Sequence, residues 1–220
     1  MLLFLDSALP KEIEFALDQW DIDGVTTNPR HVATTKQPHQ VVYKEIAKLV
    51  EGTDKPVSVE VNPHLTDWRE MVNEGLKLAE MSPNFVIKLG ASDDGFRAVR
   101  ELAAKDVRTN LTLVFSVAQA WHAARNGATY ISPFIGWKET HGDDGVELVA
   151  EVAQMLAIHN YPSQIIAAAV RNAGHMAAAA VNGAHCVTAG AAVIKDSFNN
   201  PYTDMGVKVF SDSWDQTPKG

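Results

Sequence analysis

The feature that most constrains the fold of this chain is a regular alternation between short apolar runs and segments with helical periodicity. The runs are rich in β-branched residues, and the segments between them place apolar residues at i, i+3, i+4 and i+7, as in Ile13, Ala16, Leu17 and Trp20. Strands that are apolar on both faces and alternate with helices predict a parallel sheet covered by helices. The predicted strands are residues 2–7, 24–28, 56–62, 85–90, 109–116, 130–136, 164–170 and 184–190.

Eight strand-and-helix repeats within 220 residues favour an α/β fold of the (β/α)8 TIM-barrel type over an open, doubly wound sheet. No glycine-rich dinucleotide or phosphate-loop fingerprint follows a predicted strand, which weakens a nucleotide-binding alternative. We therefore expect a single domain over residues 1–220, with Pro10 in the first turn of the first helix.

The segment after the eighth predicted strand, about 196–220, is expected to form a helical C-terminal extension. It contains more aromatic and apolar surface than a solvated tail requires, in Phe198, Tyr202, Val207, Phe210 and Trp214. Such a surface either packs on the barrel or docks on a neighbouring subunit. A homo-oligomer is therefore expected, with this segment as a candidate interface.

Charge and cysteine content exclude several classes of partner. The formal net charge is −8 and the Lys and Arg residues are scattered, so neither nucleic acid nor a membrane surface is indicated and a small molecule is the expected partner. The single cysteine, Cys186, cannot form an intrachain disulfide or a cysteine zinc cluster. The N-terminus has no basic region and meets an acid at Asp6, and no run approaches the length of a membrane span, so a cytoplasmic protein is expected.

Polar side chains stand at the C-terminal ends of the predicted strands, where enzymes with this barrel build their active sites. Individually these residues have structural explanations, since Asp6 could cap a helix and Asn28 before Pro29 suits a turn. Together, two carboxylates, an amine, amides and hydroxyls at one barrel mouth indicate a catalytic site. We expect no such residue from the eighth strand. The candidates are Asp6, Thr26, Asn28, Glu60, Lys88, Asn110, Thr112, Ser132 and Arg171.

Lys88 is the most informative of these residues, because it interrupts the otherwise apolar strand NFVIKLG at 84–90. A buried ammonium group is costly, so the side chain either reaches water at the strand end or has a chemical role. Desolvation favours the neutral amine, which can attack a carbonyl and form an imine. The imine nitrogen then accepts electrons from a cleaved carbon–carbon bond, while Asp6 and Glu60 could move protons.

Several segments resemble the transaldolase family, in the short form that includes fructose-6-phosphate aldolases. The resemblance runs in register over nearly the whole chain and implies a (β/α)8 barrel without a metal or organic cofactor. The segments are DGVTTNP at 23–29, VSVEV at 57–61, FVIKLGAS at 85–92, TNLTLVFS at 109–116 and ISPFIG at 131–136.

The resemblance also implies roles for individual residues. Lys88 is similar to the Schiff-base lysine of the fourth strand, and Asp6 to the acid/base at the C4 hydroxyl of the donor. Glu60 and Thr112 resemble the pair that holds the catalytic water. The residues that resemble the hydrogen-bonding groups around the dihydroxyacetone part of the substrate are Asn28, Asn110 and Ser132, with Thr26 a further binding candidate beside them.

The anion site departs from the family pattern. Trp137, followed by Lys138, stands where typical members place a phosphate-binding arginine, while Arg171 in AAVRN preserves the second arginine, with Ala169 in place of a serine. Arg30 follows TTNP, where the family usually has a small residue. Trp137, Lys138, Arg171 and Arg30 are therefore candidate binding residues, although Arg30 and Lys138 could instead face solvent and Trp137 could simply pack at the rim.

Two arginines, each donating two hydrogen bonds, suit a phosphate dianion. One arginine with an indole N–H fits a monoanionic sulfonate. The segments GWKE and YTD are similar to the family branch that acts on 6-deoxy-6-sulfofructose. The sequence thus predicts a transferase that moves a dihydroxyacetone unit from 6-deoxy-6-sulfofructose or fructose 6-phosphate to an aldehyde such as glyceraldehyde 3-phosphate.

Three alternatives stay open from the sequence. An aldolase-type lyase would protonate the enamine instead of passing it to an acceptor, although Glu60 favours a transferase because aldolase relatives commonly carry glutamine there. A sugar-binding barrel without catalysis is disfavoured by the retained Lys88, Asp6 and Glu60. An unrelated barrel isomerase would use Glu60 and Lys88 as base and electrophile.

Overall fold

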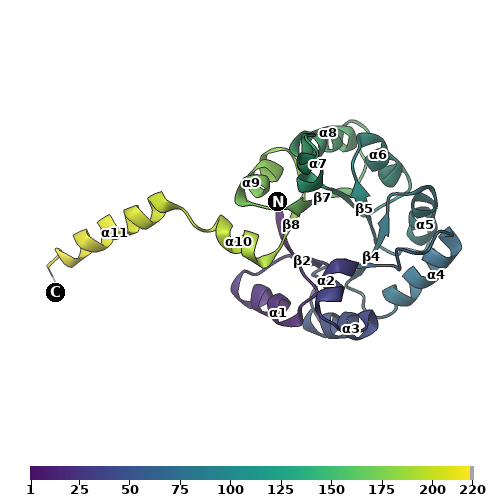
Figure 1. Cartoon of the computed structure of the whole chain (residues 1–220), viewed down its shortest axis with the longest axis horizontal. Helices are drawn as coiled ribbons and strands as arrows, with labels where there is room; N and C mark the ends of the chain where they lie inside the picture. Colours follow the sequence, from purple (N-terminus) through teal and green to yellow (C-terminus); the bar gives the residue numbers. More distant parts are fainter. Residues whose placement is uncertain (219–220) are drawn as a thin grey trace.

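Eight parallel strands close into a barrel in the computed structural model, which describes residues 1–218. Each strand pairs with its neighbours in chain order, and β8 closes the barrel by pairing with β1 (Figure 1). The prediction of a (β/α)8 barrel with a C-terminal helix is confirmed. The strands are β1 (Leu2–Asp6), β2 (Gly24–Thr26), β3 (Val57–Glu60), β4 (Phe85–Gly90), β5 (Thr109–Val114), β6 (Tyr130–Pro133), β7 (Gln164–Val170) and β8 (Cys186–Ala189).

Helices surround the barrel and bury the outer faces of the strands (Figure 1). Pro10 opens the first of them, as predicted. The helices are α1 (Pro10–Gln19), α2 (Pro29–Thr34), α3 (His39–Leu49), α4 (Trp68–Ala79), α5 (Asp93–Ala103), α6 (Val117–Arg125), α7 (Ile135–Thr140), α8 (Gly145–Ile158), α9 (Ala173–Val181), α10 (Ala191–Ser197) and α11 (Pro201–Asp215).

An apolar plug fills the interior of the barrel below the polar residues of its mouth. Alternate side chains of a strand point to the same side, so Phe4 lies on the face of Asp6, and Val86 on the face of Lys88. The buried plug excludes water from the space directly below the polar groups. The plug consists of Phe4, Val86, Tyr130, Ile166 and Cys186.

Two strands bend at the mouth of the barrel. The pairing register shifts between Leu111 and Val114 in β5 and between Ala167 and Val170 in β7. At each bend a residue other than glycine adopts a left-handed backbone, with φ of 58° at Leu113 and 55° at Ala169. Bulges of this kind re-aim neighbouring side chains next to active sites.

The sequence prediction placed the sixth strand over 130–136, but the observed strand is shorter. β6 ends at Pro133, and α7 already begins at Ile135. Residues 134–136 are apolar or small because they pack at the start of α7, which lies against α8 and β7. The apolar run alone does not distinguish these two roles.

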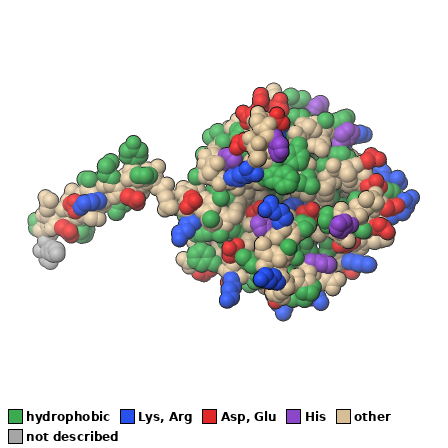
Figure 2. All heavy atoms as spheres, in the orientation of Figure 1, with side chains coloured by type: hydrophobic (Ala, Val, Ile, Leu, Met, Phe, Trp, Pro, Cys, Tyr) green, Lys and Arg blue, Asp and Glu red, His purple; other side chains and the backbone are tan. Residues whose placement is uncertain are grey.

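The C-terminal helix α11 extends away from the barrel (Figure 1). None of its residues is buried, and Figure 2 shows apolar side chains exposed along it. Its exposed large apolar residues are Tyr202, Met205, Val207, Val209, Phe210 and Trp214. Among residues 1–218, none of the helices combines the length and apolar character that crossing a membrane requires.

Candidate active site

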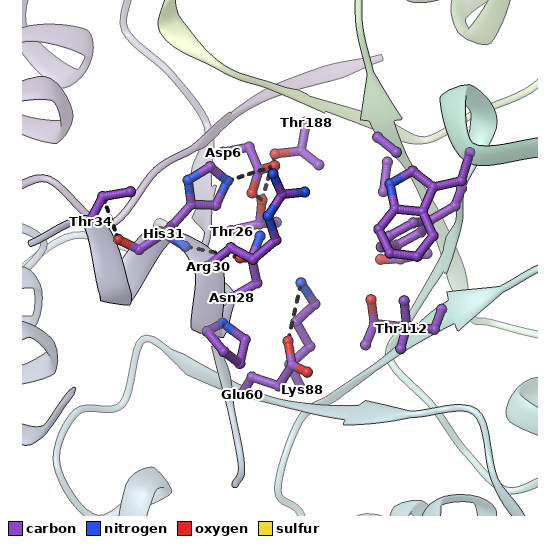
Figure 3. A pocket seen from close by; sticks show the side chains of 17 residues that line it. Asp6, Thr26, Asn28, Arg30, His31, Thr34, Glu60, Lys88, Thr112 and Thr188 are labelled. Carbon is purple, nitrogen blue, oxygen red and sulfur yellow. Dashed lines mark hydrogen bonds and ion pairs between the residues drawn. The ribbon is translucent and has the colours of Figure 1, made fainter. Parts of the chain in front are cut away.

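A cavity of about 430 Å³ opens at the C-terminal ends of the strands. Most of the residues predicted from the sequence meet there, although they come from eight different elements. Figure 3 shows how the labelled side chains point into this space. The predicted residues that line it are Asp6, Thr26, Asn28, Arg30, Glu60, Lys88, Thr112, Ser132 and Trp137.

Lys88 lies at the floor of the cavity and is only 5% exposed. Its Nζ donates a hydrogen bond to the carbonyl oxygen of Thr27 at 3.0 Å and lies 3.7 Å from Oε2 of Glu60. The two side chains meet because Glu60 and Lys88 are partners in the register of β3 and β4. The amine is therefore held at a fixed place, with a carboxylate close enough to exchange a proton with it.

The two carboxyl groups of the cavity have pKa values displaced in opposite directions. Burial raises the pKa of Glu60, and the nearby charge of Lys88 offsets only part of this effect. Burial also acts to raise the pKa of Asp6, but hydrogen bonding by His31 and the charge of Lys88 outweigh it and hold that pKa below its ordinary value. Two carboxyl groups whose pKa values differ in this way can serve one as an acid and the other as a base.

Asp6 is held by side chains on two sides. Its Oδ1 accepts a hydrogen bond from Thr26 Oγ1 at 2.8 Å, and its Oδ2 lies 3.2 Å from Nε2 of His31. The Thr26 hydroxyl in turn contacts the hydroxyl of Thr188 at 2.6 Å. The carboxylate is thus fixed in orientation by residues of β2, α2 and β8.

Asn110 lies beneath the cavity wall and outside its lining. It is completely buried, accepts a hydrogen bond from Ser132 Oγ at 2.8 Å and donates one to Ser58 Oγ at 3.0 Å. Thr112 differs, because its buried Oγ1 lines the cavity without a hydrogen-bond partner among residues 1–218. Buried hydroxyl groups are normally paired, so this one is available to a water molecule or a substrate.

An aromatic wall and a single arginine form the upper part of the cavity. Trp137 stacks on Phe115 at 6.1 Å between ring centres and meets Phe134 edge-on at 5.5 Å. Arg30 extends into the cavity from α2 (Figure 3). This part of the site combines a guanidinium group with an indole whose position is fixed by packing.

The structure does not bring Lys138 and Arg171 into the lining of the cavity. Lys138 Nζ lies 3.3 Å from Oδ2 of Asp143. Arg171 donates a hydrogen bond to Thr140 Oγ1 at 2.6 Å, and its side chain crosses Gly136, where a Cβ would lie 2.8 Å from Nε. Substrate binding by these two residues stays a prediction that their positions do not support.

Two residues of the cavity that contact Asp6 or Thr26 were not predicted from the sequence. The expectation that the eighth strand supplies no polar residue is wrong, because Thr188 of β8 lines the cavity. Alternate residues of a strand point to the same side, so Thr188, two residues after Cys186, faces the barrel interior as Cys186 does. This spacing is the signal in the sequence that could have revealed Thr188. His31 was missed because its contact with Asp6 depends on how α2 follows β2, which residue spacing does not indicate.

A buried lysine beside Glu60, in a cavity that Asp6 also lines at the mouth of a (β/α)8 barrel, suits an enzyme that forms an imine with a carbonyl substrate. Residues 3–218 match the model of the family described as "Transaldolase/Fructose-6-phosphate aldolase". The chain belongs to this family.

Named relatives match almost the whole chain. A 6-deoxy-6-sulfo-D-fructose transaldolase from Priestia aryabhattai is 45% identical over 218 residues, which are 99% of this chain and 96% of the relative. A probable transaldolase 1 from Bacillus cereus is 42% identical over 217 residues, 99% of each chain. The structure of a thiamine phosphate pyrophosphorylase from Pyrococcus furiosus matches with a TM-score of 0.62 at 16% identity over 89% of each chain, a likeness of fold alone.

Proposed function

We propose that this protein is a transaldolase that transfers a dihydroxyacetone unit from an anionic ketose to an aldehyde through an imine on Lys88. The observation that carries the proposal is the buried Lys88 amine, 3.7 Å from Glu60 in a cavity that Asp6 also lines. Membership of the transaldolase/fructose-6-phosphate aldolase family supports the same reaction.

In this proposal Glu60 takes a proton from Lys88, and the neutral amine attacks the C2 carbonyl of the ketose. Glu60 then returns that proton, so the C2 oxygen leaves as water and a protonated imine forms. Asp6 then accepts the proton of the C4 hydroxyl while the C3–C4 bond breaks. The electron pair of that bond moves to the imine nitrogen as an enamine, and an aldehyde leaves. The enamine attacks the acceptor aldehyde, whose oxygen takes the proton back from Asp6.

Hydrolysis of the product imine requires a positioned water molecule. Glu60, whose pKa is raised by burial, and the unpartnered hydroxyl of Thr112 line the cavity with Lys88. In the proposed reaction they hold this water and move its proton as it attacks the imine carbon. Lys88 is then released with the new ketose.

The proposed donor is 6-deoxy-6-sulfofructose, and the proposed acceptor is glyceraldehyde 3-phosphate. Arg30 and the indole of Trp137 line the cavity, where one guanidinium group and one N–H donor suit a sulfonate monoanion. The relative from Priestia aryabhattai named as a 6-deoxy-6-sulfo-D-fructose transaldolase supports this donor.

Reductive trapping tests the imine. The protein is incubated with fructose 6-phosphate or 6-deoxy-6-sulfofructose, treated with borohydride and digested, and a reduced dihydroxyacetone adduct is expected on the peptide that contains Lys88. Lys88→Ala should abolish both trapping and transfer, whereas Lys44→Ala, at an exposed position on α3, serves as the control. Transfer by Lys88→Ala at a rate close to that of the wild type would overturn the proposal.

We also infer that α11 docks on a second copy of this chain. Beside the base of α11 lies a groove of about 620 Å³ between α1 and α10, in which Trp20 meets Phe15 and Phe198 edge-on. The groove is lined by two lysines, Lys11 and Lys195, and one acid, Glu12, whereas α11 carries three aspartates and a single lysine. A helix with no buried residue gains little stability alone, because its own barrel buries none of its apolar surface. Contact with another copy of the chain would bury that surface and stabilise the helix.

A further inference from the structure

His31 contacts the oxygen of Asp6 that Thr26 leaves free. Its Nε2 lies 3.2 Å from Oδ2 of Asp6, while Thr26 donates to Oδ1 (Figure 3). The two donors therefore hold the carboxylate from both of its oxygens. A carboxylate restrained at both oxygens cannot rotate about its terminal bond without losing a hydrogen bond.

The backbone of α2 fixes the place of the His31 ring. Asn28 caps this helix by accepting a hydrogen bond from the backbone N–H of His31 at 3.1 Å, and Pro29 occupies the first turn. Both residues restrict the start of the helix, and with it the direction in which the ring leaves the backbone. The side chain of His31 is 33% exposed and that of Asp6 is 23% exposed, so the ring covers part of the carboxylate.

The chemistry of the pair determines which nitrogen carries the hydrogen. An ionised carboxylate accepts hydrogen bonds and donates none, so the ring nitrogen that faces it must be the one with a proton. His31 therefore donates from Nε2 to Asp6. A donor in this position favours the ionised form of Asp6, which is the form that can accept the C4 hydroxyl proton in the proposed reaction.

We propose that His31 is a positioning residue for Asp6, which orients the carboxylate and keeps it ionised for proton transfer in the transaldolase reaction. The role of this contact in catalysis rests on the proposed function, whereas the effect of His31 on the ionisation of Asp6 does not. Its hydrogen bond is the largest of the influences that lower the pKa of Asp6.

Other ionisable groups face the same cavity and must be held constant in a test. They are Glu60 from β3, Lys88 from β4 and Arg30, which precedes His31 on α2. All three remain in place when only His31 is changed. A difference between variants at this one position therefore reports the His31 contact.

The test compares His31→Leu, which removes the donor, with His31→Gln, whose amide nitrogen lies at about the same reach as Nε2 and cannot titrate. His64→Leu, an exposed histidine after β3, is the control. The titration of the Asp6 carboxyl carbon is followed by NMR in the unliganded protein labelled with ¹³C-aspartate, with the signal assigned by its absence in Asp6→Asn. Steady-state transfer kinetics are measured on the same proteins.

In His31→Leu we expect Asp6 to titrate at higher pH than in the wild type and kcat to fall about ten- to a hundredfold, with little change in KM. His31→Gln should restore most of the wild-type Asp6 titration and most of the wild-type kcat. His64→Leu should change neither the Asp6 titration nor kcat. An unchanged Asp6 titration in folded His31→Leu and His31→Gln, or an unchanged kcat in His31→Leu, would overturn the inference. If Lys88 traps no ketose while the Asp6 titration still moves, the proposed function fails and the positioning of Asp6 by His31 stands.

Discussion

Glu60 Oε2 lies 3.7 Å from Lys88 Nζ at paired positions of β3 and β4, with 11% of the Glu60 side chain and 7% of the Lys88 side chain exposed. The separation is short enough for a proton to pass between them through a small movement. Because the plug of apolar residues lies below, water reaches the two groups only from the cavity above them. The same pair can therefore prepare the amine for attack and later direct water at the imine.

Replacing Glu60 by glutamine is expected to lower kcat about a hundredfold or more, since the shape remains but the proton acceptor is lost. Because burial raises the pKa of Glu60, the wild type should lose activity on acidification at a higher pH than an ordinary glutamate would cause. Stopped-flow or coupled assays across pH would measure both effects. A Glu60→Gln protein that loses stability but keeps its rate would show that Glu60 is structural, while a gain in lyase activity would support its role in handling water.

Asp6 is expected to make folding stability depend on pH. Its pKa in the folded protein lies below the ordinary value of 3.8, so the unfolded chain takes up the proton first as the pH falls. This contribution to the free energy of unfolding is complete above the ordinary pKa and is lost as the pH falls through the folded value. Chemical denaturation of the wild type and Asp6→Asn from about pH 6 to about pH 3 should show the difference shrinking on acidification. A difference that is constant with pH would contradict the prediction.

Trp137 is expected to set the preference between sulfonate and phosphate. Trp137→Arg should shift the ratio of kcat/KM values toward fructose 6-phosphate by about ten- to a hundredfold, because a charge-assisted contact is typically worth about 1.5–3 kcal/mol. Trp137→Phe is the matched control, since it keeps a smaller aromatic ring against Phe115, lacks the N–H donor and introduces no charge. If the wild type strongly prefers fructose 6-phosphate and Trp137→Arg changes nothing, the sulfonate assignment is wrong.

Arg30 is expected to contribute more to anion binding than the other two cationic candidates, because only Arg30 lines the cavity. Arg30→Ala should lower kcat/KM for anionic ketoses about ten- to a hundredfold and leave an uncharged donor such as dihydroxyacetone nearly unaffected. Lys138→Ala should have little effect. An Arg171→Ala protein that loses more activity than Arg30→Ala would show that Arg171 leaves Thr140 to bind the substrate.

The α11 helix is expected to determine the assembly state. Replacing Phe210 and Trp214 by serine should shift the protein to smaller species in analytical ultracentrifugation, because these exposed side chains supply the proposed contact with a second copy. Lys208→Ser is the control, because it changes a polar position of the same helix. A wild type that sediments as a monomer at all accessible concentrations would exclude the docking.

The barrel and most of its polar mouth could be predicted from the sequence because they depend on local patterns. The strand at 85–90 and the strand at 164–170 were predicted with the bounds that the structure shows, since apolar runs of this length leave little freedom in a parallel barrel. Lys88 stood out because a charge within such a run has few structural explanations.

Other features could not be predicted because they arise from packing between distant segments. The left-handed backbones of Leu113 and Ala169 occur at residues without a conformational preference for that region, so the bends in β5 and β7 have no sequence signature. The placement of Arg171 against Thr140 depends on how α7 packs against β7. The residue type of Arg171 predicts that it binds an anion. In the structure its guanidinium group instead donates a hydrogen bond to Thr140, the last residue of α7.

The pairing of β8 with β1 has a consequence for the chain as it is synthesised. Thr188, near the end of the barrel sequence, contacts Thr26, which donates to Asp6 in the first strand. A nascent chain that lacks β8 has exposed edges on β1 and β7 and an incompletely supported Asp6. We therefore expect enzymatic competence to emerge only after the ribosome has delivered the last strand, so the onset of turnover during translation would report barrel closure.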